Sequence, residues 1–273
     1  MARRTRKLWV GIGVATLAGA SVASNVGAQD PGHKTHGPPP PAQKGGADAK
    51  RGEGGEAYLT DGGPKDTRIR FYRDIELMRG HLLVGRQLIE LELWDEALPH
   101  FLHPTEELYG LMEKYIKLHK MQPFKRELQA LAQTVKAKRK GAHDQALKAV
   151  DQRLDGALAV AKRFMTPVRS FTIKSAIEVL RVAQSEYDAS MQDGRFVKPV
   201  EYQDSRGFVW QAERMIESAG PIDAPSLAKI RAAFAKLKAA WPAPMPPPKP
   251  ILEVGQVAAL ILEIELAASR LSL

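Results

Sequence analysis

The stretch RIRFYRDIELMRGHLLVGRQLIELE, residues 68–92, decides the fold class, because its large apolar residues recur three, four or seven positions apart. That spacing matches the 3.6-residue turn of an α-helix and puts the apolar side chains on one face. The apolar stripe consists of Phe71, Ile75, Met78, Leu82 and Ile89. We therefore expect a long amphipathic helix that begins near Thr67 and buries this stripe in a core.

Helical patterns continue to the end of the chain, interrupted by proline and glycine, and no alternating strand pattern intervenes. Segments that end near Gly194 and at Gly220 have the length and apolar spacing of helices. The last segment, residues 251–273, is strongly apolar but carries three glutamates, which favours a buried bundle helix over a membrane span. Residues 67–273 are thus predicted to form one all-α, antiparallel helical bundle, with a proline-rich spacer at 242–250.

The first 66 residues have a different composition from the rest of the chain. Residues 1–28 combine a basic start, a short apolar core and small residues before Gln29, which is the pattern of a cleaved signal peptide. Retention of this segment as an N-terminal anchor remains the alternative. Residues 29–66 are rich in glycine, proline and charge, so we expect a disordered linker. These features predict export to the periplasm.

Composition excludes several kinds of chemistry. The chain has no cysteine, which rules out disulfides, thiol chemistry and iron–sulfur ligation. Its formal charge is +9, and the predicted signal supplies four of those positive charges. The remainder is modest, so we expect no nucleic-acid partner. The basic stretch 117–140 is typical of a solvated helix face, and alternatively of contact with acidic lipid headgroups or a partner protein.

Possible metal donors gather in WDEALPHFLHPTEELYG, residues 94–110. His100 and His103 are three residues apart and share a face in helical geometry, and Glu107 follows one turn later. His81, at the flank of the apolar stripe, is a third imidazole on the preceding helix. Imidazole with carboxylate suits zinc, iron, copper or nickel. Ordinary helix-end chemistry alone, with a histidine at a helix C-terminus and two glutamates at a helix start, explains most of this stretch.

Two prolines bracket the histidines of this corner. Asp95 is expected to cap a short helix that contains Pro99 in its first turns. Pro104 suits the first position of a new helix, where its missing N–H costs nothing. The sequence therefore predicts a rigid corner between two helices, with His100 and His103 between the prolines.

A second group of acids lies about a hundred residues downstream. Glu201 and Asp204 are three apart on one helical face, and Glu186 lies near the end of the preceding helix. In an antiparallel hairpin these carboxylates approach one another, and a cation or a proton would offset their repulsion. Ordinary salt bridges to Lys198 and Arg206 are the competing interpretation.

The motifs HFLHPTEELY and EYQDSRGFV together resemble the helical extracytoplasmic domains found with bacterial iron permeases, and more distantly imelysin-like periplasmic proteins of iron uptake. The similarity spans roughly residues 72–218. It implies a periplasmic metal-handling bundle in which the residues matching these motifs hold the metal, namely His100, His103, Glu107, Glu201 and Asp204. The imelysin pattern Gly-x-His-x-x-Glu is absent, because Val84 stands where its glutamate belongs.

The function predicted from these observations is binding and delivery of a transition-metal ion, with iron as the expected ion, in uptake or homeostasis, and not catalysis. The predicted donors are His81, His100, His103, Glu107, Glu201 and Asp204, and the expected partner is a membrane metal transporter. The alternative is a non-catalytic periplasmic interaction module without a metal. Imidazoles more than about 8 Å from every other donor would favour that alternative, since metal–nitrogen bonds are near 2.1 Å.

Overall fold

The computed structural model describes residues 58–59 and 63–271, all within one compact unit, Ala47–Leu273. The predicted signal 1–28 and most of the predicted linker lie outside these residues. Tyr58 and Leu59 fall in the segment expected to be a disordered linker, but they contact the helices. The Tyr58 hydroxyl donates to Glu178 Oε2 at 2.6 Å, and Leu59 is buried in the core. These two residues of the predicted linker are thus held against the helices.

The described chain is mostly helical, as the sequence predicts. In chain order its elements are α1 (Thr67–Glu90), α2 (Trp94–His103), the π-helical segment η2 (Pro104–Leu108), α3 (Tyr109–Leu118), α4 (Lys125–Lys136), α5 (Lys140–Lys162), α6 (Val168–Ala189), β1 (Met191–Gln192), β2 (Arg195–Phe196), α7 (Pro199–Glu217), α8 (Ala224–Lys238) and α9 (Val254–Ser269). The short antiparallel pair β1–β2 turns at Asp193 and Gly194, both with positive φ, and was not expected from the sequence.

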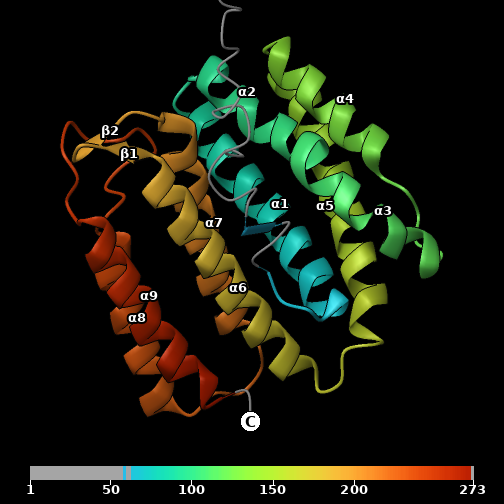
Figure 1. Ribbon diagram of the computed structural model, residues 1–273. Helices are drawn as coiled ribbons and strands as arrows, with labels where there is room; N and C mark the ends of the chain where they lie inside the picture. Colours follow the sequence, from blue (N-terminus) through green and yellow to red (C-terminus); the bar gives the residue numbers. More distant parts are fainter. Residues whose placement is uncertain (1–57, 60–62, 272–273) are drawn as a thin grey trace, which may run out of the picture. The chain divides into compact units, whose positions relative to one another are not determined.

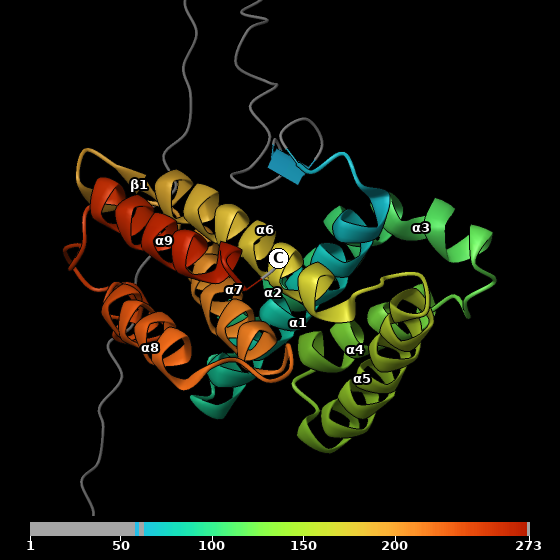
Figure 2. The ribbon, with the colours of Figure 1, turned by 90° about the horizontal axis from the view of Figure 1, so that it is seen from below.

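The four C-terminal helices form a bundle. In it α6 packs against α7, α8 against α9, and the two pairs meet through α6 with α9 and α7 with α8. On the other side of α6 and α7 lies α1, which also packs against α2, and α4 with α5 lies beyond it (Figures 1 and 2). Helix α1 is therefore enclosed, and its buried residues run almost without a gap from Phe71 to Gly85. The sequence predicted one buried stripe on this helix, whereas α1 buries residues on all sides between Phe71 and Gly85.

The corner after α2 differs from the prediction. Leu93, not Asp95, is the N-cap of α2, and Asp95 lies inside its first turn. Pro104 does not open a separate helix, because the backbone stays helical through it, and the Tyr109 N–H donates to the Pro104 carbonyl five residues back. Proline has no N–H for the carbonyl four residues before it, and a π-turn accommodates this loss without ending the helix.

The C-terminal segments are held closely to the bundle. The spacer 242–250 is anchored by the Tyr202 hydroxyl, which donates to the Ala243 carbonyl at 3.0 Å, and by the Gln203 amide, which donates to Met245 Sδ at 3.3 Å. Helix α9 buries one face, but Leu262 and Leu266 on it are more than half exposed, so the expected burial holds for one side only. None of the described helices is long and apolar enough to cross a membrane.

Candidate metal site

Four possible metal donors from three helices meet at one point. They are His81 on α1, His100 and His103 on α2, and Asp204 on α7. One ligand atom from each lies within 4.8 Å of the others. The structure thus brings together four of the six residues that the sequence nominated, and it turns the helical corner toward Asp204 and away from water.

The three imidazoles converge on the Asp204 carboxylate through the same ring nitrogen. His81 Nδ1 lies 2.6 Å and His100 Nδ1 lies 2.7 Å from Asp204 Oδ1, and His103 Nδ1 lies 3.1 Å from Oδ2. The side chains of His81, His100 and Asp204 are at most 5% exposed, whereas that of His103 is 15% exposed. The cluster is therefore buried on three sides and approached through His103.

Two glycines let α1 and α7 come close enough to form this cluster. Gly80 precedes His81, and Gly207 lies three residues after Asp204. A Cβ on Gly207 would overlap the Gly80 carbonyl oxygen, and a Cβ on Gly80 would lie 2.6 Å from the Phe208 ring. Backbone-to-backbone contact here places His81 Nδ1 within hydrogen-bond distance of Asp204. Real Cβ atoms do not fit such gaps, so any side chain would force the helices apart.

A third glycine sets the distance between α1 and α2. A Cβ on Gly85 would lie 2.6 Å from the ring of Phe101, the residue after His100. Of the two roles that a glycine one turn after His81 can have, access for a ligand or close helix packing, the structure shows packing.

His100 is held at both ring nitrogens. While Nδ1 faces Asp204, Nε2 lies 2.9 Å from Gln203 Oε1, and Gln203 in turn donates to Met245 Sδ. Gln203 is 1% exposed. A buried amide oxygen beyond the histidine fixes the orientation of the ring, as the outer partners of metal-bound histidines do.

The electrostatics of the cluster centre on Asp204. Burial alone would raise the pKa of Asp204, but the surrounding histidines lower it well below its usual range, so the carboxylate stays ionised. Burial lowers the pKa of His81. For His103, burial also favours the neutral ring, but the hydrogen bond and charge of Asp204 outweigh it and raise the pKa to about 9. Glu107 and Glu186 act in the same direction.

The other two nominated residues lie beside the cluster and not in it. Glu107 Oε1 is 3.5 Å from His103 Nδ1, and Glu201 pairs with Lys198 at 3.1 Å. Both line a cavity of about 270 Å³ together with Glu186, His103 and Asp204. The downstream acids thus approach one another as expected for a helical hairpin. The salt-bridge interpretation holds for Glu201 with Lys198, whereas the guanidinium of Arg206 donates to the Gln87 side chain and the Trp241 carbonyl.

The donor set fits a transition metal. Three imidazole nitrogens and one carboxylate oxygen match the preferences of zinc, iron, copper and nickel. Two bonds of about 2.1 Å on opposite sides of an ion span about 4.2 Å, so donors within 4.8 Å of one another reach a single ion after small side-chain shifts. His100 Nδ1 and His103 Nδ1 lie 2.7 Å and 3.1 Å from the Asp204 carboxylate, well inside the limit of about 8 Å from another donor that was set from the sequence.

Sequence reasoning missed Gln203 and the Gly80–Gly207 contact. Gln203 is adjacent to Asp204, but residues next to each other on a helix point in different directions, so its role depended on where α2 lies. Gly80 adjoins His81 and Gly207 lies almost one helical turn after Asp204, and that proximity was the available signal.

A comparison with protein families gives one match. Residues 165–272 match the iron permease-associated 4-helix bundle domain. The match covers α6 to α9, with Glu186, Glu201 and Asp204 inside it, and leaves the three histidines before it. The resemblance to iron permease-associated domains is thereby confirmed, over a range further toward the C-terminus than 72–218. No curated protein and no solved structure matches the chain.

Proposed function

We propose that this chain, with its iron permease-associated four-helix bundle, is an exported protein that binds a transition-metal ion at His81, His100, His103 and Asp204. The observation that carries the proposal is the convergence of four donor atoms within 4.8 Å at a buried point. A buried carboxylate needs a neutralising positive charge, which protonated His103 supplies in the metal-free protein and a bound cation would supply in the loaded protein.

Iron is the first ion to test. The donor set alone accommodates several first-row metals, so donor chemistry does not choose among them. The family match is what favours iron, because the matched domain is described as associated with iron permeases. The role we propose is binding and delivery in uptake or homeostasis, and not catalysis. The signal-like residues 1–28 support a periplasmic location.

The partner we propose is a membrane metal transporter, again because of the matched domain. The basic stretch 117–140 supports a position close to the membrane. It contains eight lysines and arginines, all exposed, and a single acid, Glu127. Lys117 pairs with Glu113 and Lys138 with Asp95, and most of the other cations have no acidic partner among residues 58–59 and 63–271.

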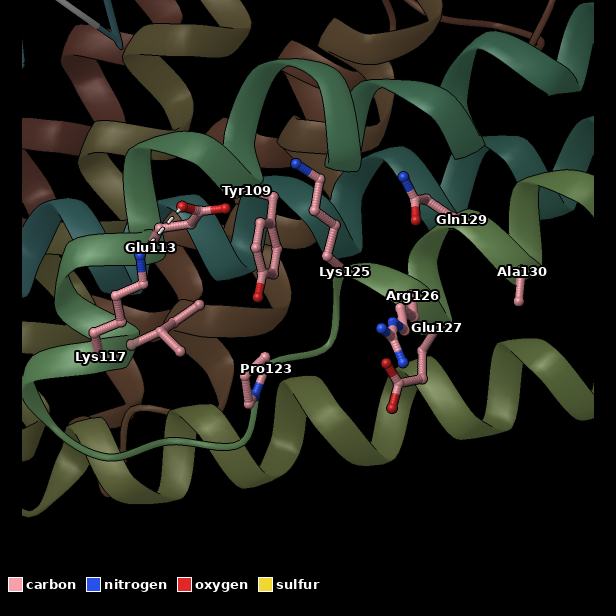
Figure 3. Close-up of a pocket in the computed structure, with 10 residues that line it drawn as sticks. Tyr109, Glu113, Lys117, Pro123, Lys125, Arg126, Glu127, Gln129 and Ala130 are labelled. Carbon is pink, nitrogen blue, oxygen red and sulfur yellow. Dashed lines mark ion pairs between the residues drawn. The ribbon is translucent and has the colours of Figure 1, made fainter.

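A cavity of about 830 Å³ between α3 and α4 adjoins this basic surface (Figure 3). Its lining includes Tyr109, Ile116 and Pro123, with Lys125 and Arg126 among the charged residues. Apolar lining beside cations suits anionic lipid headgroups, each cation contributing about 1 kcal/mol near a charged surface. The fraction of protein that sediments with phosphatidylglycerol vesicles should fall as salt rises, and should also fall in the double variant Lys125→Gln/Arg126→Gln. The control variant Lys174→Gln/Lys229→Gln, with its substitutions on α6 and α8, should sediment like the wild type. Equal binding to neutral vesicles would reject this contact.

The metal proposal is tested by calorimetry on the chain without residues 1–28. Anaerobic Fe²⁺, and Zn²⁺ and Co²⁺ in parallel, should bind at one ion per chain more tightly than about 100 μM, which corresponds to roughly 5.5 kcal/mol. Asp204→Asn should abolish this binding, and Asp188→Asn, an exposed aspartate on α6, should not. Undiminished binding by Asp204→Asn would place the metal elsewhere.

A further inference from the structure

The buried cluster needs a route by which an ion reaches it. His81, His100 and Asp204 are almost fully excluded from solvent, and His103 is the ligand with partial exposure. The cavity of about 270 Å³ shares His103 and Asp204 with the cluster. It therefore joins the four donors to the outside on the side of His103.

The lining of this cavity is acidic. Glu107 comes from η2, Glu186 from the last turn of α6, and Glu201 from the first turn of α7. Asp204 adds a fourth carboxylate, and Pro99 and Val200 complete the wall together with His103. No lysine or arginine is among these lining residues. Lys198 pairs with Glu201 and offsets one of the charges.

We infer that Glu107, Glu186 and Glu201 form the access route by which a hydrated divalent cation reaches and leaves the four-residue site. The inference rests on the proposed function. A cleft lined by one sign of charge with low-dielectric walls concentrates ions of the opposite sign and raises association rates by about 10- to 1,000-fold. The route has a direction, since Glu107 lies 3.5 Å from His103 Nδ1, and His103 precedes the more deeply buried donors.

The size of the cavity fits this cargo. Six waters at roughly 30 Å³ each occupy about 180 Å³, which the cavity of about 270 Å³ accommodates. The route thus suits a hydrated ion, whose water ligands are replaced when it reaches the imidazoles. A recipient that takes the ion by the same route would contact the C-terminal end of α6 and the N-terminal end of α7.

The test is the kinetics of Co²⁺ binding, followed by the visible absorption of the ion in stopped flow. The triple variant Glu107→Gln/Glu186→Gln/Glu201→Gln should bind one ion per chain with an association rate at least about 10-fold lower. Its dissociation rate should change by less than about 3-fold, since charges at the rim of a site act mainly on association. Glu106→Gln, an exposed glutamate next to Glu107 that does not line the cavity, should associate like the wild type.

A second measurement needs no variant. The wild-type association rate should fall steeply as monovalent salt rises from about 10 mM to about 0.5 M, because salt screens the cavity charges, and the triple variant should have lost this dependence. A salt-independent wild type, a triple variant as fast as Glu106→Gln, or a variant that differs only in dissociation would each overturn the inference. If the wild type binds no Co²⁺, or Asp204→Asn binds it equally well, the proposed function itself fails.

Discussion

His100 is the residue of the cluster that has a hydrogen-bond acceptor at both ring nitrogens. Its Nδ1 faces Asp204 Oδ1 and its Nε2 faces Gln203 Oε1, so an acceptor lies at each nitrogen. A neutral imidazole carries one N–H and can donate to only one of them, whereas an imidazolium donates to both. A metal ion between Nδ1 and Asp204 also satisfies both nitrogens, because Nε2–H then donates to Gln203 while the Nδ1 lone pair binds the ion. The buried amide thus holds the ring with Nδ1 toward Asp204, which is the orientation that metal binding needs.

Gln203→Leu removes the acceptor at Nε2 and leaves a side chain of similar size. We expect metal affinity to fall by about 10- to 100-fold, as for other partners that orient a metal-bound histidine, whereas Gln203→Glu, which keeps an acceptor, should retain most of the affinity. Calorimetric titration measures both, with the exposed Gln133→Leu on α4 as the control. A Gln203→Leu protein that binds like the wild type would show that the amide plays no part in the site.

The raised pKa of His103 predicts that metal binding releases a proton. With a pKa of about 9, His103 is protonated at neutral pH in the metal-free protein. An ion must displace this proton, so the apparent affinity should rise as pH increases toward 9 and level off above it. Calorimetry in buffers of different ionisation enthalpy should find about one proton released per ion at pH 7. No release at pH 7 would contradict a protonated His103 that gives up its proton to the ion.

At the scale of the elements, the site depends on how closely α1, α2 and α7 approach. Gly80 and Gly207 bring the backbones of α1 and α7 into contact, and Gly85 receives the Phe101 ring from α2. The π-turn of η2 follows His103 directly and carries Glu107. Turns of this kind occur often at functional sites. The helices are therefore packed so that their ligands meet.

Gly207→Ala tests this packing. The added methyl group overlaps the backbone of α1, which cannot rotate away, so we expect a loss of about 1–3 kcal/mol in the free energy of unfolding, together with weaker metal binding. Gly156→Ala on α5 is the matched control, because nothing lies within 4 Å of its Cβ position. It should be neutral or stabilising by up to about 1 kcal/mol. Denaturant unfolding measures both, and equal stability of the two variants would contradict the packing argument.

Local sequence patterns predicted the helices. The features that they did not predict depend on packing between residues far apart in the sequence. The apolar spacing of residues 68–92 predicts α1, but it does not predict that other helices surround α1. An apolar stripe on one face carries no information about the helices that follow in the sequence and pack against the other faces. The spacing of His100 and His103 puts them on one face, but their distance from Asp204 depends on glycine contacts more than a hundred residues apart. Glu201 was nominated on the same grounds as Asp204, but it lies at the start of α7, outside the cluster, and pairs there with Lys198.

At the scale of the whole described unit, the site links two parts of the chain. The matched residues 165–272 contribute Asp204, and the helices before them contribute the three histidines. An iron permease-associated bundle thus acquires its imidazole donors from α1 and α2, which pack against α7. A bound ion would join these helices to the bundle, and its affinity would add to the stability of the unit.

The most direct test of the account is an anomalous difference map, measured at the iron absorption edge, from crystals of the protein loaded with Fe²⁺. We predict one strong peak about 2.0–2.2 Å from Nδ1 of His81, His100 and His103 and from the Asp204 carboxylate, as for other imidazole and carboxylate ligands. Bound iron elsewhere, or no peak between these residues in protein that calorimetry shows to be loaded, would contradict the account.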